Sequence, residues 1–405
     1  MGIRSEGESV RWDKRILTWA ALALLAVLFI ASLVGPIRNA HGEDNLYVHQ
    51  AAAFLKGRLD IPRHYHDTAV FEGRYYVPFP PAPAVLMLPL VALLGVHRTN
   101  PVLVGLAVAI LSVWLLGRIL RRLGVEKGAI PWLLVGYFLG TVYWSCVVMG
   151  AGVWFTAHLV STAALFLAID EALGHKRGIL VGLYLGISFL SRQLTAFLAP
   201  FLIALLLAEG EPAPMAVRLR RLAGFVVSCA LLGGAYLAFN WARFGNPFDS
   251  GYKYLLLGGH LLERFLQFGL FHPRYVLFNA FYLFVQGFHV HFTGSRFLTI
   301  GGMDGWGTSL VAASPFLFAS LAARGRKPLL WAAWASILLC LVPQLFYYNN
   351  GWWQINGQRF TMDFLPVLIV LTALGVRRVQ GAVWKGAVVY AVCLNALALV
   401  IVPWL

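Results

Sequence analysis

Charged residues are scarce in this chain. Asp, Glu, Lys and Arg together make up 12% of its 405 residues, against roughly 25% in soluble domains. Apolar residues make up 60%. A water-soluble protein of this length could not hide that much apolar surface without exposing large patches. The composition therefore excludes a soluble globular fold and indicates a protein that resides in a lipid bilayer.

Cysteine is also rare, and its positions exclude two further classes. None of the four cysteines forms a Cys-x-x-Cys pair and all lie within apolar stretches, which excludes a disulfide framework and a cysteine metal site. We expect them to be small buried side chains. They are Cys146, Cys229, Cys340 and Cys393.

Acidic residues are fewer than basic residues, 17 against 32, which gives the chain a net charge of +15. A basic chain can bind nucleic acid, but these basic residues form short runs between long apolar stretches, as in the cytoplasmic loops of membrane proteins. The sequence contains no nucleic-acid-binding motif. We therefore expect no nucleic-acid partner.

Long apolar runs are what the chain has in abundance, and they predict an all-α integral membrane protein. The runs are continuous rather than short and alternating, which favours a polytopic helical bundle over a transmembrane barrel. The first run follows a basic segment, as in a signal peptide, but it is long enough to span and no small-residue cleavage site follows it, so we expect a retained helix. We expect about eleven spans, at 16–34, 81–97, 101–117, 130–148, 150–169, 179–207, 222–241, 306–323, 328–346, 360–375 and 383–404.

Basic clusters predict the orientation of the bundle. Because such clusters stay in the cytoplasm, they place the loops 35–80, 243–305 and 347–359 outside. The clusters are the N-terminal segment, Arg218 with Arg220 and Arg221, Arg324 with Arg326 and Lys327, and Arg377 with Arg378 and Lys385.

The middle of the chain conflicts with simple alternation of spans. Alternation would place the basic group Arg118, Arg121, Arg122 and Lys127 outside, against the positive-inside rule. The conflict disappears if 81–97 is a short re-entrant element and the run 179–207 consists of two half-helices. The three outer loops stay outside in either case. Within the first of them, 44–57 predicts an amphipathic helix that lies in the membrane interface.

Four motifs in this order resemble a known superfamily. The first loop opens with Glu43-Asp44, followed by Tyr47, an alanine-rich turn and Gly57. The other three are the proline-rich entry GRYYVPFPPAPAVLMLP, the stretch NWARFGNPFDSGY and the late stretch GQRFTMDFLPVL. Together they resemble the GT-C superfamily of polyprenyl-phosphate-dependent glycosyltransferases, such as protein O-mannosyltransferases and the lipid A aminoarabinose transferase.

The resemblance implies a single membrane domain over 1–405, with a catalytic module at 1–245 and an outer loop plus C-terminal spans at 246–405. It implies an inverting glycosyltransferase of the plasma (inner) membrane whose active site faces the outside. Its partners would be a polyprenyl-phosphate sugar donor, membrane lipids, and a glycan, lipid or protein acceptor. Members have Asp-Glu where this chain has Glu-Asp, so the register to the tyrosine puts Glu43 in the catalytic place.

Sugar transfer from a lipid phosphate needs one carboxylate to deprotonate the acceptor and cationic groups around the phosphate. Asp44 fits the role of base because it follows a span directly, and Glu43 is the alternative. Asp44 could instead only cap the helix that follows it. Asp67, in the same loop, is a second acidic group that could position the acceptor or a metal, or a solvated loop residue.

A divalent metal is possible but has no established ligand set. His64, His66 and Asp67 lie close in sequence, as do His289 and His291, yet neither spacing matches a known site. We therefore predict no particular metal ligand.

Arginines are the expected phosphate ligands, because a guanidinium donates two parallel hydrogen bonds to a phosphate. Arg359 sits at the mouth of a span and is the first choice, although an interfacial arginine can also only snorkel. The further choices are Arg243, Arg74 and Arg296. Arg192 lies within an apolar run and could pair structurally instead.

Aromatic side chains outside the membrane could stack on a sugar. We expect Tyr47, Trp352 and Trp353 to contact substrate, although Trp and Tyr also form belts at membrane interfaces. A transporter or flippase of lipid-linked sugars and a non-catalytic scaffold remain as alternative functions. A transporter should show an internal repeat, which the sequence lacks.

Overall fold

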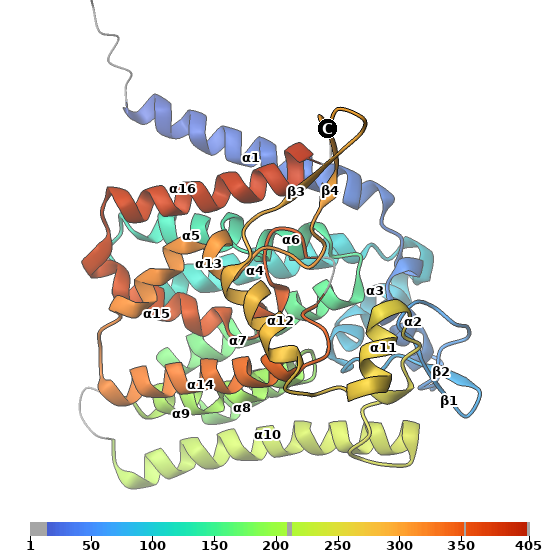
Figure 1. The fold of residues 1–405 in the computed structure, drawn as a ribbon. Helices are drawn as coiled ribbons and strands as arrows, with labels where there is room; N and C mark the ends of the chain where they lie inside the picture. Colours follow the sequence, from blue (N-terminus) through green and yellow to red (C-terminus); the bar gives the residue numbers. More distant parts are fainter. Residues whose placement is uncertain (1–13, 209–212, 352–353, 403–405) are drawn as a thin grey trace, which may run out of the picture.

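The computed structural model describes residues 14–208, 213–351 and 354–402. It is a bundle of roughly parallel helices with two small hairpins and short helices at one end (Figure 1). Six helices are long and apolar enough to cross a membrane. They are α1 (Lys14–Asn39), α4 (Pro101–Arg122), α7 (Val153–Leu173), α10 (Met215–Phe244), α14 (Lys327–Phe346), and α16 (Ala382–Ala396) with its π-helical extension Leu397–Ile401.

Shorter helices complete the bundle and its loops. Those within the bundle are α5 (Ile130–Leu139), α6 (Tyr143–Val148), α8 (Gly178–Phe189), η2 (Gln193–Leu198), α9 (Ala199–Leu207), α13 (Leu310–Ala313), η5 (Pro315–Ala322), η6 (Arg359–Asp363) and α15 (Leu365–Val379). Those in the loops are η1 (Gly42–Asp44), α2 (Leu46–Phe54), α3 (Ala82–Arg98), η3 (Tyr252–Tyr254), α11 (Gly259–Phe268), α12 (Tyr275–Ala280) and the π-helical turn Phe281–Val285. The strands are β1 (Ala69–Phe71), β2 (Arg74–Tyr76), β3 (Val290–Thr293) and β4 (Thr299–Met303), paired as two antiparallel hairpins. The chain is therefore a polytopic all-α membrane protein.

The helix α7 is the centre of the bundle. Its sequence is apolar on every side of the helix, and nearly all of its side chains are buried. A helix that is apolar all round is stable only when neighbours cover it, and α4, α8 and α9 pack against it. The first turn of α7 thus holds a fixed position beneath the loops.

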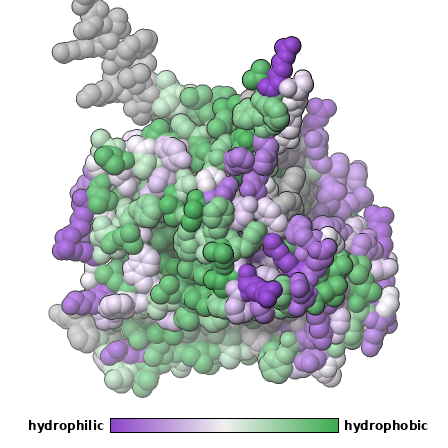
Figure 2. Space-filling view, in the orientation of Figure 1, coloured by the Kyte–Doolittle hydropathy of each residue, from purple (hydrophilic) through white to green (hydrophobic). Residues whose placement is uncertain are grey.

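Hydrophilic side chains gather at the two ends of the bundle, with an apolar band between them (Figure 2). One end, which we call the basic end, brings together turns that are distant in sequence. There Arg122 pairs with Asp170 at 2.8 Å, and Arg377 donates to the carbonyl of Leu123 at 2.9 Å. The opposite end, with α2, α11 and the strands β1 and β2, we call the loop end.

The expected span 81–97 does not cross the membrane. The side chain of Asn100, just after α3, donates to the carbonyl of Ile37 at the loop end of α1 (2.8 Å). The backbone N–H of Ala82, where α3 begins, donates to the carbonyl of Leu190 (2.8 Å). Both ends of α3 therefore lie toward the loop end, and α3 packs along α2 instead of spanning. The next helix, α4, then carries its arginines to the basic end, which removes the conflict with the positive-inside rule.

The expected run 179–207 is two half-helices, as the charge pattern indicated. The helix α8 leaves the basic end, the chain turns at residues 190–192, and η2 with α9 returns. At the basic end, Lys176 links the start of α8 to the end of α9 by donating to the carbonyl of Leu205 at 3.2 Å. The broken hairpin therefore places Arg192, at its tip, inside the bundle near the loop end.

Three glycines let α8 approach α10 closely. Gly178, Gly182 and Gly186 repeat at every fourth position, the small-residue spacing common at helix contacts in membranes. A Cβ at Gly178 would overlap the carbonyl of Arg221, and a Cβ at Gly182 would overlap that of Phe225. The glycines therefore make the contact that holds the hairpin in place.

Substituting Gly182 by valine should lower the free energy of unfolding by about 1–3 kcal/mol, the usual cost of overpacking. Gly234→Val on α10 is the matched control, because nothing lies within 4 Å of a Cβ at Gly234. Thermal unfolding of both variants in detergent measures the difference. Equal melting temperatures for the two variants would contradict the role of Gly182.

Candidate functional site

A cavity with two connected compartments opens at the loop end. The inner compartment has about 880 Å³ of empty space and the outer compartment about 1220 Å³, and both volumes include space that is open to solvent. Aromatic rings and one guanidinium line both. These shared residues are Phe79, Trp154, Arg192, Tyr252, Tyr347 and Phe360.

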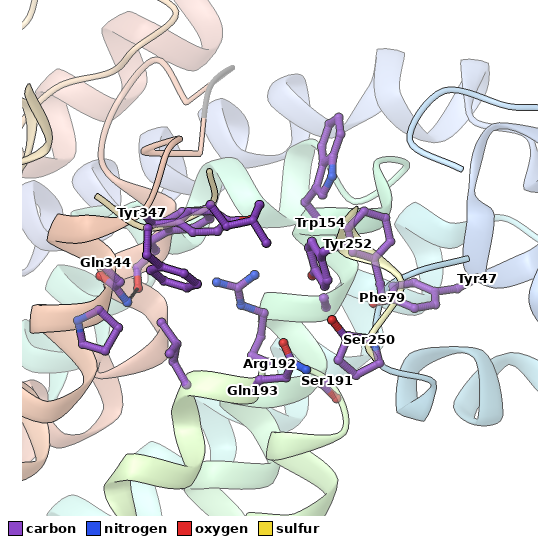
Figure 3. A pocket seen from close by; sticks show the side chains of 17 residues that line it. Tyr47, Phe79, Trp154, Ser191, Arg192, Gln193, Ser250, Tyr252, Gln344 and Tyr347 are labelled. Atoms are coloured by element: carbon purple, nitrogen blue, oxygen red, sulfur yellow. Dashed lines mark hydrogen bonds between the residues drawn. The ribbon is translucent and has the colours of Figure 1, made fainter. Parts of the chain in front are cut away.

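Arg192 points into the cavity from the tip of the broken hairpin, between Tyr347 and Tyr252 (Figure 3). Its guanidinium forms two parallel hydrogen bonds with the carboxylate of Asp363, each 2.9 Å long. It also stacks 5.0 Å from the centre of the Phe360 ring. The side chain keeps 18% of its surface accessible. Arg192 is thus held rigidly and still faces the cavity.

Asp363 joins four parts of the fold at the base of the cavity. Besides Arg192, it accepts a hydrogen bond from the amide of Gln344 on α14 at 3.3 Å. The imidazole of His158 on α7 lies 3.4 Å from it. The Asp363 side chain is fully buried. A buried carboxylate with several donors fixes the geometry of all of them.

Arg359 lines the outer compartment from the start of η6. Its backbone N–H donates to the side chain of Gln354 at 2.8 Å, and its guanidinium lies 5.0 Å from the ring centres of Trp154 and Phe155. Burial, together with the nearby Arg192, lowers the pKa of Arg359. An arginine remains a cation even so. The guanidinium groups of Arg192 and Arg359 therefore line the same compartment.

Asp67 is the carboxylate among the described residues that line this cavity. Its backbone adopts the left-handed conformation, with φ of 65°, which aspartate tolerates better than most residues. The His66 imidazole lies 3.7 Å from its carboxylate. Burial raises the pKa of Asp67, and the charges of His66 and Arg359 oppose the increase. The expected second acidic group therefore lies beside the expected phosphate ligand Arg359.

Glu43 and Asp44, the expected bases, lie outside the two compartments. Asp44 is exposed, and its carboxylate accepts a hydrogen bond from the backbone N–H of His41 at 3.2 Å. Glu43 is half exposed and lies 3.5 Å from the His97 imidazole. The cap of α2 is Asn45, whose side chain accepts from the backbone N–H of Tyr47. The loop therefore places neither of these acidic residues in the lining of the cavity.

Three other expected phosphate ligands are not brought together with Arg359. Arg243 is buried and donates to the carbonyl of Val77 at 2.7 Å, so it ties α10 to the segment that leads into α3. Arg74 is exposed on β2 and lines a separate surface groove. Arg296 is exposed in the turn between β3 and β4.

Of the three aromatic residues expected to contact substrate, the structure describes one. Tyr47 is fully buried in α2 and lines the inner compartment. Trp352 and Trp353 lie outside the described residues. Two further aromatic residues, Trp154 and Tyr252, line both compartments and were not expected there from the sequence. The only signal for Trp154 was its place just after the helix break GAG at 150–152.

A metal ligand set is not assembled in the described part of the chain. No group of three or more His, Cys, Asp or Glu residues there could hold a metal ion. His289 and His291 contact each other, with ring centres 4.6 Å apart. His66 lies near Asp67 and edge-on to the Trp154 ring, and His64 packs on Tyr75.

Comparison with known proteins supports the fold. No protein family and no curated protein matches the chain. Two solved structures do: ArnT from Cupriavidus metallidurans bound to undecaprenyl phosphate (TM-score 0.51, 15% identity), and the same protein in the apo state (TM-score 0.51, 14% identity). The matches cover 89% and 92% of this chain but only 60% and 61% of those structures, so the chain spans about three fifths of their length. The chain thus shares the fold of ArnT over most of its own length.

Proposed function

We propose that the protein is an inverting glycosyltransferase that moves one sugar from a polyprenyl phosphate to an acceptor outside the cytoplasm. One observation carries the proposal: a single cavity combines a carboxylate, Asp67, with two guanidinium groups, Arg192 and Arg359. The shared fold with ArnT, whose structure holds undecaprenyl phosphate, supports a polyprenyl phosphate as the donor.

Asp67 is the base in this proposal, in preference to Asp44 or Glu43. It takes the proton of the acceptor hydroxyl as the hydroxyl oxygen attacks C1 of the sugar. The bond between C1 and the phosphate oxygen breaks on the opposite face, and its electron pair leaves with the lipid phosphate. Attack opposite to the leaving group inverts the configuration at C1. Asp67 suits this step because it lies in the cavity. The Asp44 carboxylate lies outside the cavity and accepts a hydrogen bond from the backbone N–H of His41.

Arg192 and Arg359 stabilise the leaving group. A sugar phosphodiester carries one negative charge, and the phosphate gains a second as the bond to C1 breaks. Fixed cations near a developing charge lower the barrier because they need no reorganisation during the reaction. Asp363 holds Arg192 in place from below, and aromatic rings hold Arg359.

The orientation follows from the charges at the two ends. The basic end lies in the cytoplasm by the positive-inside rule, so the cavity faces the outside of the plasma (inner) membrane. There a glycan, lipid or protein acceptor can reach it.

Release of labelled sugar from a polyprenyl phosphate tests the function directly. The purified full-length chain in nanodiscs is incubated with undecaprenyl phosphate carrying a radiolabelled sugar and with a mixture of candidate acceptors. Transfer yields water-extractable or acceptor-bound label together with free undecaprenyl phosphate. Movement of intact sugar lipid across the bilayer of proteoliposomes, without release of sugar, would show a flippase instead.

The pH dependence of transfer should report the environment of Asp67. Because burial raises its pKa, Asp67 loses its proton at a higher pH than an ordinary aspartate, whose pKa is about 3.9. We expect kcat/KM to fall as the pH drops through this raised pKa. His66→Gln removes a charge that lowers the pKa, so the acidic limb should move to still higher pH. An acidic limb that His66→Gln leaves unmoved would argue against Asp67 as the titrating group.

A further inference from the structure

The second hairpin, β3–β4 in the outer loop 243–305, carries an apolar tip that the described part of the chain does not cover. The strands pair antiparallel from Val290 with Met303 to Thr293 with Thr299. Phe292, Phe297 and Leu298 cluster at the turn, with 53%, 72% and 80% of their surface exposed. None of the three belongs to the apolar core clusters of the described chain.

In the first hairpin, β1–β2, the apolar side chains are covered by the bundle. Its Phe71 and Tyr76 pack against Phe244 of α10, with ring centres 5.5 and 5.3 Å away. Its turn is polar and exposed, with Glu72 at the tip. One hairpin of the same loop end therefore turns its apolar side chains inward, and the other turns them outward. Burial against the residues that the structure describes does not explain the tip of β3–β4.

The direction of the β3–β4 hairpin indicates what covers it. Its strands run across the direction of the helices and project sideways past α1, rather than beyond the loop end (Figure 1). Its base is fixed to the bundle, because the backbone N–H of Ser309 donates to the carbonyl of Gln286 at 2.8 Å. A hairpin that leaves a membrane bundle sideways lies along the plane of the membrane.

An exposed apolar segment directly precedes the hairpin in the sequence. The helical segment directly before the hairpin, α12 with its π-helical turn, exposes Leu277 and Val285 by 82% and 67%. This segment is apolar along its whole length and packs on α14, a spanning helix. The chain therefore enters the hairpin from an exposed apolar segment that packs on a spanning helix.

We propose that the tip of β3–β4 inserts into the membrane leaflet at the loop end and anchors the outer loop to phospholipid. The strand edges carry unpaired backbone groups, which hydrocarbon does not tolerate, so the hairpin lies at the boundary between headgroups and acyl chains. Phe297 and Leu298 enter the acyl region there. Arg296, next to them, reaches the phosphate of a lipid headgroup by extending toward water.

The hairpin is connected to the cavity because both belong to the same outer loop. The same outer loop supplies residues 255–261 to the wall of the outer compartment. Trp306, just after β4, contacts His260 in that wall, with ring centres 5.0 Å apart. Anchoring the hairpin thus restrains the wall from its far side. This inference does not depend on the proposed reaction.

Spin labels at the tip test the insertion in the full-length protein. Phe297→Cys and Leu298→Cys are prepared in a background in which Cys229 and Cys393 are alanine. Contrary to the expectation from the sequence, Cys229 is only half-buried and Cys393 is exposed. Glu72→Cys at the other hairpin is the matched control. In nanodiscs of phosphatidylethanolamine and phosphatidylglycerol, the collision rates of each nitroxide with O₂ and with a water-soluble nickel chelate are measured. We expect O₂ collisions to dominate at 297 and 298, and nickel collisions to dominate at 72.

Each alternative gives a different result. Dominant nickel collisions at 297 and 298 would place the tip in water and overturn the proposal. Low collision rates with both reagents would place it against protein, which also overturns it. The two positions give independent readings, so failure of one variant to fold leaves the test intact.

Discussion

Replacing Asp67 by asparagine is expected to lower the rate of sugar transfer about 10²–10⁴-fold, the contribution of a general base. Asparagine keeps the size and hydrogen-bonding capacity of the side chain but accepts no proton at any working pH. Binding of undecaprenyl phosphate should change little, because Arg192 and Arg359 remain. Transfer of radiolabelled sugar and retention of fluorescent undecaprenyl phosphate by the same preparation measure the two effects.

Asp44→Asn and Glu43→Gln are the controls for Asp67→Asn. Both residues lie outside the cavity, and in Asp44→Asn the amide oxygen of the new side chain can still accept from the backbone N–H of His41. We expect both variants to transfer sugar within a few-fold of the natural chain. Loss of transfer in Asp44→Asn together with full activity in Asp67→Asn would reverse the assignment of the base.

Hydropathy predicted the membrane fold but not the course of every run. The run 81–97 is apolar enough to span, yet α3 contains Pro89 and a break at Gly95, and its two ends are tied to the loop end. Hydropathy reports that a segment prefers lipid, not that it crosses. The basic residues of α4 supplied the missing information, because the positive-inside rule is satisfied if 81–97 does not span and 179–207 is two half-helices. In the structure both ends of α3 lie toward the loop end, and α8 and α9 are two half-helices.

The site was less predictable than the fold. Both Asp44 and Asp67 lie in the first outer loop, and only the path of the chain decides which one reaches the cavity. That path depends on contacts distant in sequence, such as the bond from Asn45 to the carbonyl of Ala151. Arg192 and Asp363 are 171 positions apart, so no local motif could pair them. Arg359 does line the cavity, and its sequence signal was an ionisable group at the mouth of a span, which is costly and often functional; its role as a phosphate ligand stays a prediction.

Asp363→Asn is expected to lower the free energy of unfolding by about 3–5 kcal/mol, the cost of leaving one member of a buried ion pair uncompensated. The change removes the countercharge of Arg192 and weakens the contacts from Gln344 and His158. Thermal unfolding in detergent measures the loss. Transfer should fall too, but a destabilised variant cannot show by itself whether Arg192 acts on the substrate.

Replacing both members of the pair separates stability from function. In Arg192→Met with Asp363→Leu, no charge is left buried and two apolar side chains fill similar space, so stability should recover most of what Asp363→Asn loses. If Arg192 serves only to hold the hairpin tip in place, this stable double variant should also recover transfer. If Arg192 stabilises the leaving phosphate, the double variant should fold well and still bind undecaprenyl phosphate weakly and transfer almost no sugar. We expect the second result, because the guanidinium faces the cavity between Tyr252 and Tyr347 while its countercharge lies fully buried behind it.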